Sequence, residues 1–132
     1  MTSEQIIFQK IANGQPIILL GKHKVMLGSH EVHYRFKSFP KKNPNKFPFN
    51  INPNSVNAQF ELFICGSEYI YYLIPIDVLK MMYKHPDAYP DRLHPKITII
   101  TIDSYLDTVT YARPSISLDL TPYKNKSLDT QS

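Results

Sequence analysis

The chain has 132 residues, of which 42% are hydrophobic and 20% charged, a balance that fits one globular domain with a sizeable core. A single cysteine excludes an internal disulfide framework and a cysteine-rich zinc site, and four glycines cannot build a glycine-rich phosphate loop. No apolar run approaches the roughly 20 residues that cross a bilayer, and the N-terminal residues lack a signal-peptide pattern. We therefore expect a soluble, cytoplasmic protein with no membrane partner.

The positive charge is concentrated in one segment. The net charge is +4, but residues 32–60 hold five basic residues and no acidic residue. Residues 61–132 hold nine acidic and seven basic residues. This clustering predicts an anionic partner, which we take to be nucleic acid, in the first place DNA.

The N-terminal residues predict a short helix followed by an antiparallel meander. Ser3 is a candidate N-cap, and Gly14 would end the helix. Three strand candidates follow at residues 17–20, 24–27 and 31–39, separated by turns that contain glycine.

The third of these strands alternates strictly between apolar and ionisable residues. The apolar positions are Val32, Tyr34 and Phe36, and the ionisable positions are Glu31, His33, Arg35 and Lys37. Because successive side chains of a strand point to opposite faces, one face would be apolar and the other charged. His33 also lies where it could meet His23 across neighbouring strands, with Glu31 nearby. That arrangement can bind a metal, although surface histidines without metal are the simpler interpretation.

Residues 40–57 predict a long exposed loop. The segment is rich in proline, asparagine and lysine and has neither a helical nor a strand period. A loop of this length in a small domain is usually functional or disordered. Its phenylalanines argue against disorder, because something must bury or bind them.

The remaining sequence completes an α+β fold. Residues 60–65 and 69–76 are apolar at nearly every position, which predicts two strands in the centre of the sheet. A helix over 77–84 and strands over 97–102, 109–112 and 116–120 follow. We expect a mixed or antiparallel central sheet of about six to eight strands with two or three short helices. Residues 1–123 would form the single domain, with Cys65 buried, and residues 124–132 a polar tail.

Two stretches resemble the PD-(D/E)XK, or restriction-endonuclease-like, nuclease superfamily. Residues 32–38 are similar to the family's strand that bears Glu/Gln-x-Lys-Ser/Thr, with Lys37 at the lysine position. Residues 60–65 and 71–79 are similar to the family's later strands, in which two apolar strands are followed by an Ile-Pro dipeptide and then a helix. The resemblance covers about residues 17–84 and implies a restriction-endonuclease-like core, which in this family cleaves phosphodiesters with a divalent metal.

The sequence departs from this family at the catalytic acids. Arg35 stands where the family has a metal-binding glutamate, and an arginine repels a divalent cation. The preceding strand candidate offers no aspartate, and Glu31 lies about 20 Å before Lys37 along an extended strand. The first hypothesis is therefore a catalytically silent nucleic-acid-binding module without a cofactor. The alternative is a Mg²⁺-dependent endonuclease that uses Lys37 with a non-standard acid, such as Glu31, Glu61 or one from a partner chain.

The basic strand face and the loop suit nucleic acid because lysine and arginine contact phosphates and phenylalanine can stack on unpaired bases. The predicted binding residues are His33, Arg35, Lys37, Lys41, Lys42, Lys46 and Phe47. Two other interpretations stay open. The segment could be a solvated surface loop anchored by its phenylalanines, or the protein could be a homodimeric interaction module that pairs through residues 69–76 or another sheet edge.

Overall fold

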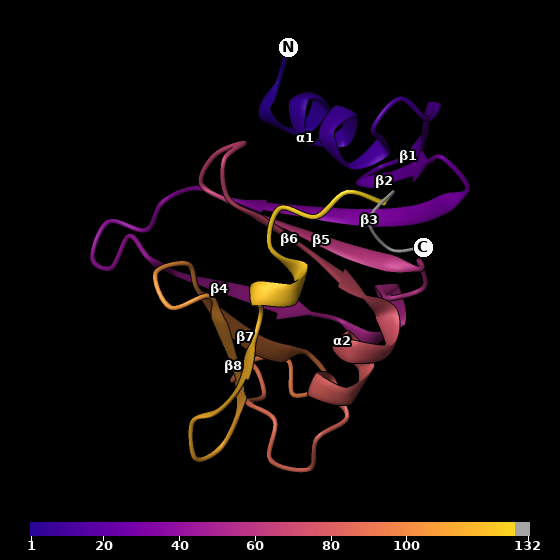
Figure 1. The fold of residues 1–132 in the computed structure, drawn as a ribbon. Helices are drawn as coiled ribbons and strands as arrows, with labels where there is room; N and C mark the ends of the chain where they lie inside the picture. The colour runs from indigo at the N-terminus through magenta and orange to yellow at the C-terminus, as the bar shows by residue number, and fades with distance from the viewer. Residues whose placement is uncertain (129–132) are drawn as a thin grey trace.

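The computed structural model describes residues 1–128, which fold into two β-sheets and two α-helices (Figure 1). The first sheet has five strands in the order β1 (Ile17–Gly21), β2 (Lys24–Leu27), β3 (His30–Lys37), β5 (Phe60–Cys65) and β6 (Tyr71–Pro75). The second has four, in the order β4 (Lys46–Ile51), β7 (Thr98–Asp103), β8 (Thr108–Ala112) and β9 (Ile116–Asp119). The helices are α1 (Ser3–Ala12) and α2 (Ile76–Tyr83), with 3₁₀ turns η1 (Pro53–Ser55) and η2 (Thr121–Tyr123). The α+β class is confirmed, but the single central sheet of six to eight strands is wrong.

The second sheet exists because residues 46–51 form a strand, where the sequence analysis predicts a loop. Every second side chain of β4 is buried, namely Phe47, Phe49 and Ile51. Pro48 is tolerated because β4 is an edge strand, where a missing N–H need not break the hydrogen-bond ladder. β4 pairs antiparallel with β7 and not with β3, so the strands divide into two sheets.

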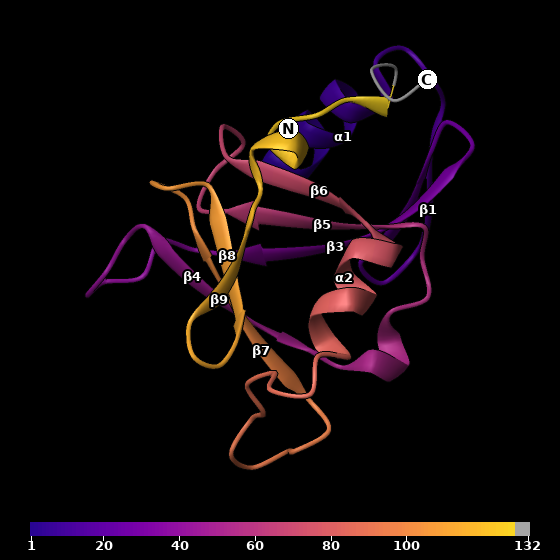
Figure 2. The ribbon, with the colours of Figure 1, turned by 60° about the horizontal axis from the view of Figure 1, so that its bottom comes forward.

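An apolar core lies on each face of the five-stranded sheet. On one face, Ile7 and Ile11 of α1 pack in a cluster that includes Leu62 of β5. On the other face, Phe63 of β5 belongs to a cluster with Phe49 and other residues of α2 and the four-stranded sheet. Figures 1 and 2 show α1 on one side of the five-stranded sheet and β4, β7 and β8 on the other. Burying each such side chain stabilises the fold by roughly 1.5–3 kcal/mol.

α1 begins at a capping box. Thr2, and not the predicted Ser3, is the N-cap: its hydroxyl accepts a hydrogen bond from the Gln5 N–H at 3.2 Å, and the Gln5 side chain accepts one from the Thr2 N–H at 2.9 Å. Asn13 ends the helix in the left-handed conformation, and Gly14 follows at φ +91°. Neither α1 nor α2 is long and apolar enough to cross a membrane, and residues 1–128 contain no other α-helix.

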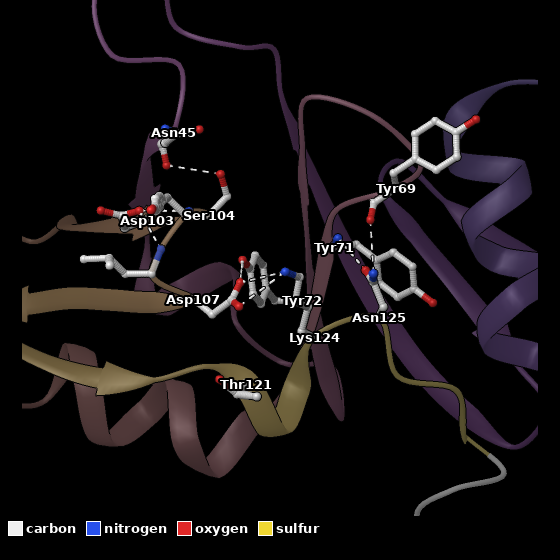
Figure 3. A network of polar contacts seen from close by, with 12 residues as sticks. Asn45, Tyr69, Tyr71, Tyr72, Asp103, Ser104, Asp107, Thr121, Lys124 and Asn125 are labelled. Atoms are coloured by element: carbon white, nitrogen blue, oxygen red, sulfur yellow. Dashed lines mark hydrogen bonds and ion pairs between the residues drawn. The ribbon is translucent and has the colours of Figure 1, made fainter.

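β6 lies at the edge of its sheet, whereas the sequence analysis places it in the centre. Its edge is occupied by residues that follow η2: Tyr72 forms a bridge with Lys124, and the Asn125 N–H donates to the Tyr71 carbonyl at 2.8 Å. The Asp107 carboxylate accepts a hydrogen bond from the Tyr72 hydroxyl at 2.7 Å and pairs with Lys124 at 3.0 Å (Figure 3). The predicted polar tail therefore begins as a segment fixed against β6, and its last four residues, 129–132, lie outside the described residues.

Candidate nucleic-acid interface

The predicted site begins on β3, which extends beyond its neighbour β2. Residues 30–33 of β3 pair with β2, while residues 32–37 pair in parallel with β5 on the other side. The last contact on the β2 side is the hydrogen bond from the Tyr34 N–H to the His23 carbonyl, at 2.9 Å. The C-terminal half of β3 is thus flanked by β5 on one side and is free of β2 on the other.

A buried carboxylate organises the charged face of β3. The parallel register places Glu61 of β5 directly beside His33, and both point to the same face as Arg35. The His33 Nδ1 contacts Glu61 Oε2, and the Arg35 Nε lies 3.3 Å from the same oxygen. Arg35 Nη1 also donates to the Asn50 carbonyl of β4 at 3.0 Å. The predicted alternation of β3 is confirmed at these positions, but the charged face is largely covered.

This ionic cluster is incompletely paired. Glu61 is 1% exposed, while the His33 and Arg35 side chains are 16% and 19% exposed. Within residues 1–128, Glu61 Oε1 and Arg35 Nη2 are buried and have no hydrogen-bond partner. A buried polar atom without a partner lowers the stability of the fold by about 1–3 kcal/mol. Stability alone therefore does not explain why these charged side chains are buried together.

A pocket of about 360 Å³ opens beside this cluster. His33 and Arg35 line it together with His23 from the β1–β2 turn and Ser55 from η1. The rings of His23 and His33 are 6.4 Å apart, and His23 has a left-handed backbone with φ +60°. Tyr34 also lines the pocket, and burial, followed by the nearby Glu4 carboxylate, raises the pKa of its hydroxyl. The pocket therefore holds two imidazoles, a guanidinium and the Glu4 carboxylate at the free edge of β3.

The predicted lysines lie on the segment that joins the two sheets. We call residues 37–46 the basic segment; they comprise the last residue of β3, the connecting loop and the first residue of β4. The exposed lysines of this segment are Lys37, Lys41, Lys42 and Lys46. Within residues 1–128, none of the four forms an ion pair with an acidic side chain. The loop projects away from both sheets in Figures 1 and 2. These four charges are therefore free for an external anion.

The predicted stacking role of Phe47 does not fit its position. Phe47 is 0% exposed, because β4 turns its ring into the core between the sheets. Phe39, which is 49% exposed, packs on Phe47 with ring centroids 5.7 Å apart and is the accessible ring of the basic segment. The alternation of apolar residues over 47–51 was the sequence signal that predicts this burial. Pro48 within the alternation made the segment resemble a loop.

The residues named for metal-dependent cleavage do not fit Mg²⁺. Glu31 forms an ion pair with Lys24 at 2.9 Å, and Glu61 lies against the cationic Arg35. Magnesium requires several oxygen ligands in a near-octahedral arrangement, which a neighbouring guanidinium opposes. Within residues 1–128, no three His, Cys, Asp or Glu side chains are arranged to hold a metal ion.

Comparisons with known proteins leave the site to be interpreted from its own residues. Neither models of protein families, nor curated proteins, nor solved structures gave a match. The resemblance of β3, β5 and β6 to restriction-endonuclease-like strands therefore stays a prediction.

Proposed function

We propose that the protein binds nucleic acid through the basic segment. The observation that carries this proposal is the set of four exposed lysines without an acidic partner between β3 and β4. Unpaired lysines bind phosphates because their contacts release counterions from the nucleic acid. A projecting loop can follow a phosphate backbone without moving the sheets.

The structure supports a division of roles among the predicted residues. The lysines supply the phosphate contacts, because the guanidinium of Arg35 is already directed to Glu61 and Asn50. His33 and Arg35 instead form the wall of the adjacent pocket. Phe39 takes the stacking role that the sequence analysis gives to Phe47, since its ring is accessible.

The test compares two variants with equal net charge. Lys41→Glu/Lys42→Glu/Lys46→Glu removes the basic segment, and Lys84→Glu/Arg92→Glu/Lys96→Glu makes the same change at exposed positions after α2. Both variants change the net charge from +4 to −2, because three cations become three anions. Fluorescence anisotropy would follow binding to labelled duplex and single-stranded DNA and RNA. We expect the first variant to lose binding and the second to keep most of it. Equal loss in both would show that only the net charge matters and would contradict the proposal.

Self-association is a second candidate function, and β1 favours it. β1 is an edge strand of the five-stranded sheet, and its apolar side chains Ile17, Ile18, Leu19 and Leu20 are all exposed. An uncharged edge of this kind can pair with another strand. The edge of β6, which the sequence analysis names first, is instead covered by Lys124 and Asn125. Light scattering should show a dimer that Ile18→Lys disrupts, and a monomer at high concentration would contradict this candidate.

A further inference from the structure

We propose that the pocket at the free edge of β3 cleaves RNA by internal transesterification, with His33 and His23 exchanging protons with the reacting oxygens. The inference rests on the proposed nucleic-acid binding, since the basic segment would deliver the strand. Lys37, on β3 two residues beyond Arg35, links the basic segment to the pocket. A volume of about 360 Å³ lies within the usual range for a small-ligand site and is sufficient for a nucleotide unit.

Glu61 prepares His33 to act as a base. Its carboxylate contacts His33 Nδ1 and accepts a hydrogen bond from Nδ1–H, so Nε2 is the unprotonated nitrogen of the neutral ring. Glu61 cannot easily turn away, because it is 1% exposed on β5, an interior strand of the sheet. The same carboxylate stabilises the imidazolium that forms when Nε2 takes a proton. Glu61 is thus a positioning residue for His33.

His23 supplies the second imidazole. It is exposed on the β1–β2 turn, and its ring lies 6.4 Å from the His33 ring, so one phosphodiester can contact both. Ser55 also lines the pocket, but its hydroxyl donates to the Asn52 carbonyl at 2.9 Å and is a poor candidate nucleophile. The Glu4 carboxylate and the Tyr34 hydroxyl line the pocket as well. The two imidazoles are the groups assigned to proton transfer, and since no protein nucleophile is assigned, the nucleophile must come from the substrate.

The 2′-hydroxyl of RNA is such a nucleophile. His33 Nε2 takes the 2′-hydroxyl proton while O2′ attacks the adjacent phosphorus and the bond from phosphorus to O5′ breaks. Protonated His23 donates a proton to the leaving O5′. The products are a 2′,3′-cyclic phosphate and a 5′-hydroxyl end, and no water, metal or redox partner enters the step. The positive charge of Arg35 in the pocket wall favours the extra negative charge that develops on the phosphoryl oxygens.

The proposed catalytic role explains why the cluster of His33, Arg35 and Glu61 keeps buried polar atoms that lower stability. Glu61 Oε1 and Arg35 Nη2 are buried without a partner within the described residues. An apolar pair at these positions would avoid that cost. The carboxylate and guanidinium beside His33 instead provide the orientation and charge that proton transfer and phosphoryl chemistry need.

The test uses three matched oligonucleotides of one sequence: RNA, DNA and 2′-O-methyl RNA. We expect the protein to cleave only RNA, to leave cyclic phosphate ends, and to bind the 2′-O-methyl strand without cutting it. His33→Gln should lower the cleavage rate by roughly 10²–10⁴-fold, the usual contribution of a general base. His23→Asn should lower it similarly, and asparagine tolerates the left-handed backbone at this exposed position. His94→Gln, at an exposed loop position, is the control and should cleave normally.

The Glu61→Gln variant distinguishes a role of Glu61 in positioning His33 from a purely structural role. We expect it to lower kcat while the affinity for 2′-O-methyl RNA stays unchanged, at a temperature where circular dichroism shows the variant folded. Binding of 2′-O-methyl RNA without cleavage of RNA would overturn this inference and leave the proposed function standing. Cleavage that persists in His33→Gln and His23→Asn would also overturn it, because it would indicate a contaminating nuclease. Absence of binding to every strand would overturn the proposed function itself.

Discussion

Glu61→Gln should destabilise the protein far more than an ordinary surface substitution. The change keeps the size of the side chain but leaves the Arg35 cation, 19% exposed, without its ionic partner. Removing one partner of a buried pair costs 3–5 kcal/mol, and the residual exposure of Arg35 and His33 places the expected loss near the lower limit, at about 3 kcal/mol. With about 2.1 cal/mol/K per residue of unfolding entropy, a chain of 132 residues would lose about 10 °C in Tm.

Urea unfolding would measure this loss, with Glu31→Gln as the matched control. Glu31 makes the same type of contact with Lys24, but both side chains are partly exposed, so its replacement should cost less than about 1 kcal/mol. Arg35→Met/Glu61→Leu removes both charges together and should be more stable than Glu61→Gln. Equal stability of Glu61→Gln and Glu31→Gln would refute the reasoning that the cluster is a buried pair.

Three further predictions concern the core and the basic segment. Phe47→Ala should cost about 3–5 kcal/mol in urea unfolding because it empties a buried site, whereas a cost as small as that of Phe39→Ala would contradict the burial of β4. Burial raises the pKa of the Cys65 thiol to about 12, so it should resist a thiol reagent at pH 8 until urea unfolds the protein, and rapid labelling of the native protein would contradict this. Gly66→Ala should cost about 1 kcal/mol more than Gly14→Ala in thermal unfolding. Both glycines have positive φ, but only at Gly66 would the new Cβ lie 2.4 Å from the Phe39 ring.

The alternation of residues 31–37 predicted which side chains share a face of β3, because side-chain direction in a strand is a local property. It did not predict their burial, since Phe36 is 46% exposed while His33 and Arg35 on the charged face are largely covered. The apolar sequence of β5 likewise predicted a buried central strand, and all six of its residues are buried. The start of α1 was missed by one residue, since both Thr2 and Ser3 can cap a helix. These features depend only on neighbouring residues.

The features that the sequence did not predict depend on pairing between segments that are distant along the chain. His33 and Glu61 are 28 residues apart and meet only because β5 runs parallel to β3, after the chain has crossed to the other sheet and returned. Nothing local to either residue predicts that register. Likewise, Pro48 made residues 46–51 resemble a loop, although an edge strand accommodates proline. The edge position of β6 followed from the two-sheet division and could not be read from its apolar sequence.

The salt dependence of binding tests the central claim most directly. Anisotropy titrations of a labelled single-stranded oligonucleotide between 50 and 200 mM salt would give the slope of log K against log salt for the wild type and the two triple variants. Four lysine contacts predict a slope of about −2.8, and about −0.7 when one lysine remains in Lys41→Glu/Lys42→Glu/Lys46→Glu. The control Lys84→Glu/Arg92→Glu/Lys96→Glu should keep the wild-type slope. A wild-type slope near zero, or the same reduction in both variants, would contradict binding through the basic segment.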